Sequence, residues 1–312
     1  MLISPTGDVI DLSDRARLGG NGSGPVGPRE VRTECPADTD LERAAGVGRI
    51  VLGGSGSGTR IVDVFERSPV RIMFPRIGGG GVEEAVLVNT AGGIAGGDRL
   101  EFDVTALADA SIAVTSQAAE RVYRALSEPA RIATKLRAGE AAKLAWLPQE
   151  TIVFNWARLD RKTDIDISSG ARLLALEWLV LGRAAHGEVM AGGSISDHWR
   201  VRKDGRLIWA DSFRATGDVF PHLHRKALLA DCRALGTLVF FGPDLDTRLA
   251  RVRDIASSLD CHCAATLVAG LLVVRLAAVG SADLRRVLRT LLQHFGRELG
   301  SGPFRVPKMW SC

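Results

Sequence analysis

A glycine-rich segment, residues 89–101, constrains the fold of this chain more than any other feature of its sequence. Two Gly-Gly pairs lie within six positions, and Asp98 follows the second pair. Residues 85–88 before the segment are apolar, and residues 100–104 after it alternate between apolar and charged side chains. That order is typical of a strand, a tight corner and a second strand. Glycine is needed where φ is positive or where another backbone approaches closely, so we interpret the segment as a structural β-corner.

The same segment lacks the pattern of a nucleotide-binding loop. A Walker loop has Lys after its last glycine and then Ser or Thr, whereas Asp98 follows Gly97 in this chain. A dinucleotide-binding fingerprint opens a helix, but the residues after Gly97 alternate as in a strand. A carboxylate on the loop would also repel phosphate. We therefore predict that the chain has no nucleotide hydrolysis of its own.

Short strand-like segments recur through the rest of the sequence. A first strand at residues 46–52 is followed by the glycine run 53–58, which we interpret as a flexible hairpin loop. Residues 110–117, 131–137 and 141–147 have the alternation and the spacing of successive antiparallel strands. The chain has 35 glycines and one tyrosine, a composition that suits many short strands joined by many corners. The sequence therefore predicts a mainly β fold.

Helical periodicity appears only in the C-terminal part. Apolar residues between 245 and 259 recur at spacings of three and four, and residues 284–295 repeat the pattern more strongly. Between these segments, residues 266–276 have the pattern of two strands around Gly270. We expect two or three helices near the C-terminal end of an otherwise β-rich chain.

Residues 1–44 are rich in Gly, Pro, Asp and Arg and have no apolar periodicity, which predicts a disordered N-terminal extension before a domain at 45–312. Residues 1–43 carry eight acidic and five basic side chains, a net charge of −3, so the remainder of this +4 chain carries +7. No cluster of Lys and Arg is interleaved with aromatics, and nucleic-acid binding is not predicted. The positive excess suits docking to acidic partners instead.

The sequence also predicts a cytoplasmic location. The first residues lack the basic and apolar regions of a signal peptide, and no window has the ~18 apolar residues of a membrane span. The five cysteines are odd in number and do not have the spacing of a disulfide framework, as expected for reduced thiols in the cytosol.

One dense group of soft metal ligands occurs, Cys261-His262-Cys263. Zinc and nickel sites usually need three or four ligands, and adjacent strand residues point to opposite faces, so His262 should oppose both cysteines. A metal-dependent hydrolase at this segment stays open as an alternative function. A hydrolase built on His186 and Glu188 has only the proximity of those residues in its favour.

Glu177 is the sharpest anomaly in the sequence, because the strand-like residues 173–181 are otherwise apolar on both faces. A buried carboxylate costs several kcal/mol unless it is paired or hydrogen-bonded. Glu177 therefore has two interpretations: it is tied to a partner such as Arg183, or it lines a wet cavity.

Three stretches in fixed order, residues 89–100, 115–124 and 146–154, resemble motifs of the urease accessory protein UreD family, called UreH in some bacteria. Residues 176–188 are similar to a further signature of that family, and residues 305–310 resemble its C-terminal end. The motif residues that we single out as structural or functional are Gly92, Gly93, Gly96, Gly97, Asp98, Gln117, Tyr123, Pro148, Glu150, Glu177, Gly182, Arg183, Gly187 and Glu188.

The resemblance implies a β-helix-like sandwich of stacked strands and a non-enzymatic role. It implies a scaffold that binds apo-urease and the accessory protein UreF, which in turn recruits the GTPase UreG. It implies no tightly bound cofactor, only nickel in transient passage through an internal tunnel, for which Glu177 is a candidate lining carboxylate. Cys261-His262-Cys263 matches no motif of the family, and a generic β-rich interaction module stays open as a third function.

Overall fold

The computed structural model describes residues 42–55, 58–75, 84–259, 261–296 and 307–310. The chain divides into two compact units, Met1–Leu41 and Glu42–Cys312. The first unit lies outside the described residues, and with it almost all of the predicted extension 1–44. All the elements named below belong to the second unit.

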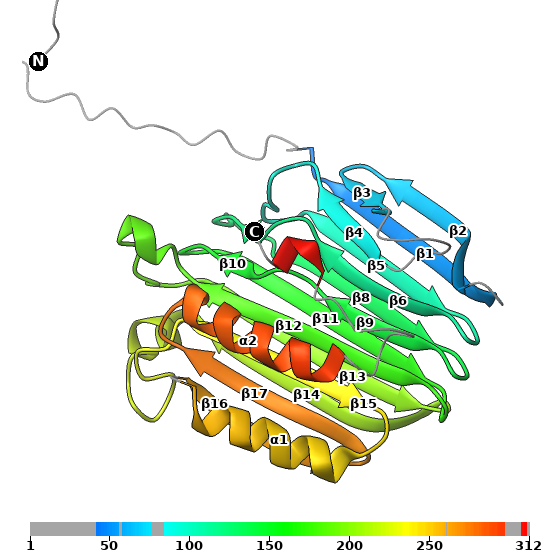
Figure 1. Cartoon of the computed structure of the whole chain (residues 1–312). Coiled ribbons are helices and arrows are strands. Elements are labelled where there is room, and N and C mark those ends of the chain that lie inside the picture. Colours follow the sequence, from blue (N-terminus) through cyan, green and yellow to red (C-terminus); the bar gives the residue numbers. More distant parts are fainter. Residues whose placement is uncertain (1–41, 56–57, 76–83, 260, 297–306, 311–312) are drawn as a thin grey trace, which may run out of the picture. The chain divides into compact units, whose positions relative to one another are not determined.

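Two facing β-sheets form this unit (Figure 1). The seven-stranded sheet has the order β14 (Arg206–Thr216), β13 (Ser194–Lys203), β11 (Arg158–Ile167), β8 (Ala130–Ala138), β5 (Arg99–Ala106), β1 (Ala45–Ser55), β2 (Gly58–Arg67). The ten-stranded sheet has the order β16 (His262–Val268), β17 (Leu271–Ala278), β15 (Ala234–Phe241), β12 (Arg172–Leu181), β9 (Lys143–Leu147), β6 (Ser111–Ser116), β4 (Glu84–Asn89), β3 (Val70–Met73). Its last two strands are β10 (Thr151–Val153), which pairs with β12 and β7, and β7 (Glu120–Val122).

The central strands pair in parallel, so the prediction of successive antiparallel strands at 110–117, 131–137 and 141–147 is wrong. In the seven-stranded sheet β5, β8 and β11 are parallel neighbours, and in the other sheet β6 is parallel to β9. The chain passes to the other sheet between β5 and β6, between β8 and β9 and between β11 and β12 instead of folding back beside itself, which stacks the strands as coils. The predicted β-helix-like sandwich is therefore confirmed, although its local pairing differs.

Hairpins occur mainly toward the ends of the chain. A turn at Asp204–Gly205 joins β13 to β14, and the predicted strand pair around Gly270 is β16 with β17. The first hairpin, β1 with β2, is tighter than we predicted from the glycine run 53–58. Gly53 and Gly54 pair within it as strand residues, and residues 56–57 lie outside the described part.

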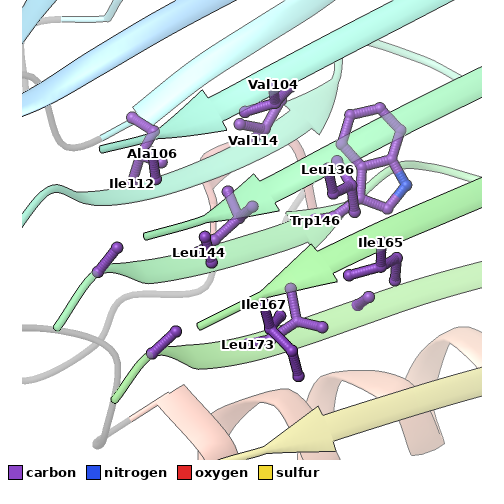
Figure 2. Close-up of a cluster of buried hydrophobic side chains, with 14 of the residues drawn as sticks. Val104, Ala106, Ile112, Val114, Leu136, Leu144, Trp146, Ile165, Ile167 and Leu173 are labelled. Atoms are coloured by element: carbon purple, nitrogen blue, oxygen red, sulfur yellow. The ribbon is translucent and has the colours of Figure 1, made fainter. Parts of the chain in front are cut away.

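The inner faces of the two sheets enclose most of the apolar core. Figure 2 shows Val104, Leu136 and Ile165 of the seven-stranded sheet in one cluster with residues of the ten-stranded sheet, among them Leu144 and Trp146. We call this the large inner cluster. A second group, the small inner cluster, also draws on both sheets and includes Leu159, Leu179 and Ile195.

In the described part of the chain, two α-helices cover the outer face of the ten-stranded sheet (Figure 1). They are α1 (Leu245–Ser257) and α2 (Ser281–Gly296), and both agree with the predicted helical segments. Short 3₁₀ turns lie at η1 (Ala184–His186), η2 (Gly217–His222) and η3 (Lys308–Trp310). Strand β12 is therefore covered on both faces, which explains why its sequence from Leu173 to Leu181 is apolar apart from Glu177.

Candidate functional site

A layer of charged side chains separates the large inner cluster from the small one. Glu177 lies on β12 between Ala175 of the large cluster and Leu179 of the small one. Arg161 on β11 and Asp197 on β13 occupy matching positions in the facing sheet and are register partners. The fold therefore brings three ionisable groups together between two apolar regions.

Arg161 holds both carboxylates of this layer. Its Nη1 donates to Glu177 Oε2 at 2.7 Å, while Nε and Nη2 donate to the two oxygens of Asp197 at 3.0 and 2.7 Å. Trp146 Nε1 donates to the other Glu177 oxygen at 2.8 Å. The side chains of Arg161 and Glu177 are only 2% and 6% exposed. We refer to Glu177, Arg161 and Asp197 as the buried triad.

The suggestion that Arg183 pairs with Glu177 is wrong. Arg183 follows β12 and forms an exposed ion pair with Glu188 at 3.1 Å. Its guanidinium also stacks on the ring of Phe154, 4.3 Å from the centroid. Arg183 is exposed because it lies just beyond the end of β12, whereas Glu177 lies in the middle of β12 on its inner face. The ion-pair partner of Glu177 comes from the facing sheet instead.

The buried triad contains more negative than positive charge. Burial raises the pKa of Glu177; the Arg161 guanidinium lowers it again, and Asp197 raises it. Burial by itself would lower the pKa of Arg161, but the carboxylates of Asp197 and Glu177 raise it, so the guanidinium stays protonated. Two carboxylates against one guanidinium sum to −1 when all are ionised. A proton or a cation near Glu177 would balance that charge.

A cavity of about 220 Å³ leads from the buried triad to the surface between the two sheets. Its walls combine apolar side chains, such as Phe102 and Ile132, with polar ones, such as Thr134 and Thr151. Its lining contains no cysteine and no histidine among the described residues. Glu177 is thus both ion-paired and in contact with a cavity.

A second carboxylate, Glu120, lines the same cavity. Asn89 Nδ2 donates to its two oxygens at 3.0 and 3.1 Å. Burial raises the pKa of Glu120 to about 7, although the bond from Asn89 opposes that rise. Glu120 lies in the motif at residues 115–124, but we did not single it out from the sequence. The sequence gives only a weak indication that Glu120 is buried, because β7 has three residues, too few for alternation to show which face is buried.

The raised pKa of Glu120 predicts a pH-dependent stability. Between about pH 4.5 and pH 7, the folded state keeps a proton at Glu120 that the unfolded chain has released, so this group's contribution to stability falls as pH rises. Glu120→Gln should flatten that fall in melting temperature, and Glu101→Gln, an exposed change on β5, should not. Identical pH profiles for the wild type and Glu120→Gln would contradict this assignment.

The glycine corner forms part of the cavity mouth. Gly92 and Gly93 line it, and Tyr123 Oη donates to the Gly92 carbonyl at 2.8 Å. Asp98 ties the corner together, because its two carboxylate oxygens accept bonds from the backbone N–H groups of Ala44 and Ala95 at 2.9 and 2.7 Å. The predicted corner is therefore present, with Asp98 as its internal cap.

Two adjacent glycines of the corner allow a matched test. Both have positive φ, 74° at Gly92 and 146° at Gly93, but only at Gly93 would a Cβ atom clash, 2.5 Å from the Tyr123 ring and 2.8 Å from the Arg121 carbonyl oxygen. Gly92→Ala should cost about 1 kcal/mol of unfolding free energy for its backbone alone. Gly93→Ala should cost roughly 1–3 kcal/mol more, measured by urea unfolding. Equal costs would show that the corner is no tighter at Gly93 than at Gly92.

The other motif residues lie around the cavity and in its supports. Gln117 and Pro148 line it, and the Pro148 carbonyl accepts a bond from Trp178 Nε1 at 3.2 Å. Glu150 accepts a bond from Arg285 of α2, whose guanidinium lies over the rings of Trp178 and Trp310. A Cβ atom at Gly96 would stand 2.6 Å from the Glu128 carbonyl oxygen, and a Cβ atom at Gly97 would clash with the Arg43 side chain. Gly182, Arg183, Gly187 and Glu188 belong to the loop that follows β12.

None of Cys261, His262 and Cys263 lines the cavity: His262 and Cys263 begin the edge strand β16, and Cys261 precedes it. His262 is exposed and the two cysteines are partly buried. Burial raises the pKa of Cys263 to about 11, with a further rise from Cys261. No group of three or more His, Cys, Asp or Glu side chains suited to a metal ion occurs among the residues described. Across all the residues that the structure describes, no helix is long and apolar enough to cross a membrane.

Comparisons with known proteins match almost the whole of the second unit. A family model described as UreD urease accessory protein matches residues 44–311. A urease accessory protein UreD of Xanthobacter autotrophicus is 42% identical over 270 residues, 86% of this chain and 91% of that protein. Proteins of the same name from a Methylobacterium species and a Chelativorans species are 41% and 36% identical and cover 83% and 91% of this chain, with 95% and 99% of their own lengths.

Proposed function

Because the chain belongs to the UreD urease accessory protein family and so has a role in urease maturation, we propose that it is a cytoplasmic scaffold for nickel insertion. In this proposal it binds apo-urease and UreF, and UreF recruits the GTPase UreG. The chain itself carries out no catalytic step. Nickel is its cargo, which passes through the cavity without staying there.

The observation that carries this proposal is the cavity that ends at the buried triad. Its carboxylates, Glu177 and Glu120, are hard oxygen donors, which hold Ni²⁺ less tightly than thiolates or imidazoles do. The excess negative charge at Glu177 attracts a divalent cation, while the cavity lining offers no soft ligand among the described residues that would trap it. Weak binding by a few oxygen donors along the path is what the transfer of a metal ion requires.

The alternative of a metal-dependent hydrolase at Cys261-His262-Cys263 has less support. The raised pKa of Cys263 favours the thiol over the metal-binding thiolate near neutral pH. The generic interaction module differs from the scaffold only in its partners, so binding experiments must separate the two.

Co-purification tests the scaffold directly. The tagged chain is expressed with the urease subunits, with and without UreF, and the captured complexes are resolved by size. We expect the urease subunits and UreF to be retained in defined stoichiometry, and the purified chain to have no GTPase activity. A chain that retains neither protein would contradict the proposal and favour the generic module.

A further inference from the structure

Three exposed apolar side chains lie on adjoining loops at one end of the sandwich. Leu126, Trp156 and Val189 are 75%, 49% and 67% exposed. The backbone joins their loops, since Ala125 N donates to the Trp156 carbonyl at 3.1 Å and Trp156 N donates to the Gly192 carbonyl at the same distance. We call Leu126, Trp156 and Val189 the Trp156 patch.

Trp156 is held in a costly conformation. Its φ is 62°, in the left-handed region that bulky side chains avoid, and its ring lies against Gly192, where a Cβ would stand 2.5 Å from it. The other five tryptophans are buried or partly buried. A strained backbone that exposes half of a tryptophan adds little to the core, and such strain often accompanies a functional surface.

The charges around the patch are mainly positive. The same loops and strand ends carry four exposed arginines, Arg121, Arg124, Arg158 and Arg183. They carry two acidic side chains, Glu128 and Glu188. Arg183 also links the patch to the cavity mouth, because it stacks on Phe154, and Phe154 contacts Tyr123 edge to face at 5.2 Å.

We propose that the Trp156 patch docks a protein partner whose surface is acidic around an apolar pocket that receives the indole. The cationic rim selects the acidic surface, and a partly exposed tryptophan with apolar neighbours is the usual centre of a protein interface. This inference rests on the proposed function, because it takes the partner to be one of the proteins that assemble with this chain. A partner seated there would lie beside the cavity mouth.

The test compares Trp156→Gly with Leu207→Ala, which removes an equally exposed side chain from β14. Glycine accepts positive φ, so Trp156→Gly should keep its melting temperature, and Leu126→Asp provides a second change at a well-solvated position. Apo-urease and UreF are titrated separately with each variant. We expect Trp156→Gly to weaken one of the two complexes about 30-fold or more, and Leu207→Ala to change neither by more than about twofold.

The charges give a second readout. Arg121→Glu with Arg124→Glu should weaken the same complex and reduce its dependence on salt concentration. If the wild type binds both proteins and Trp156→Gly binds them equally well, the inference is overturned while the proposed function stands. Self-association of the chain that Trp156→Gly abolishes, with both complexes unchanged, would also overturn it. A wild type that binds neither protein would remove the proposed function and the inference together.

Discussion

Arg161→Met is expected to lower the free energy of unfolding by about 3–5 kcal/mol, because it removes the one cation of the buried triad. The guanidinium is the shared partner of Glu177 and Asp197, and its side chain is 2% exposed. Its loss leaves two carboxylates facing each other in the interior without a positive charge between them. Thermal unfolding should show a decrease on the order of 10 °C for a domain of this size.

The control for this effect keeps the substitution and removes the charges around it. Adding Glu177→Gln and Asp197→Asn to Arg161→Met should restore most of the lost stability, because no unpaired charge is then buried. If the triple variant is as unstable as the single one, the loss comes from packing of the arginine side chain and the electrostatic account of the buried triad is wrong.

Glu177→Gln should separate stability from nickel delivery. Arg161 keeps its two bonds to Asp197, so the remaining pair is balanced, and a glutamine carbonyl can still accept the bond from Trp146 Nε1. We expect a change of less than about 2 kcal/mol in unfolding free energy, with urease and UreF still retained. Urease activation at limiting nickel should fall at least about tenfold, which corresponds to about 1.4 kcal/mol of lost attraction for the ion.

Two results would contradict this prediction. Full activation by a stable, complex-forming Glu177→Gln variant would show that the carboxylate has no part in metal transfer. A collapse in stability would show that Asp197 does not compensate for the loss of Glu177, contrary to the hydrogen bonds of the buried triad.

The sequence predicted the anomaly at Glu177 but not its partners, although a signal for them existed. Residues 159–167 alternate between inward and outward side chains along β11, and this alternation places Arg161 on the inward face, between Leu159 and Thr163. Asp197 likewise lies between Ile195 and Trp199 on the inner face of β13. Each member of the buried triad is therefore a charged residue on the inward face of its strand. Which of them meet could not be predicted, because β11 and β13 belong to one sheet and β12 to the facing sheet.

The fold class followed from alternation and glycine corners, and the two helices followed from their periodicity. Strand pairing did not, because a corner such as that at Gly139 has the length of a hairpin but leads from β8 to β9 in the other sheet. The cavity could not be predicted either. Its walls come from many segments, and Thr134 and Gln149 have side chains that look ordinary in sequence. Glu120 becomes conspicuous only once Asn89 is seen beside it.

The most direct test of the central claim is the nickel content of urease matured with a filled cavity. Thr134 lines the cavity, and its buried hydroxyl has no hydrogen-bond partner among the described residues. Thr134→Phe should place a ring in that space, and Thr134→Val removes the hydroxyl without filling it. We predict that both variants retain urease and UreF, that Thr134→Val delivers nickel normally, and that urease matured with Thr134→Phe contains less than about a tenth of the wild-type nickel. Full nickel loading with Thr134→Phe would contradict passage through this cavity.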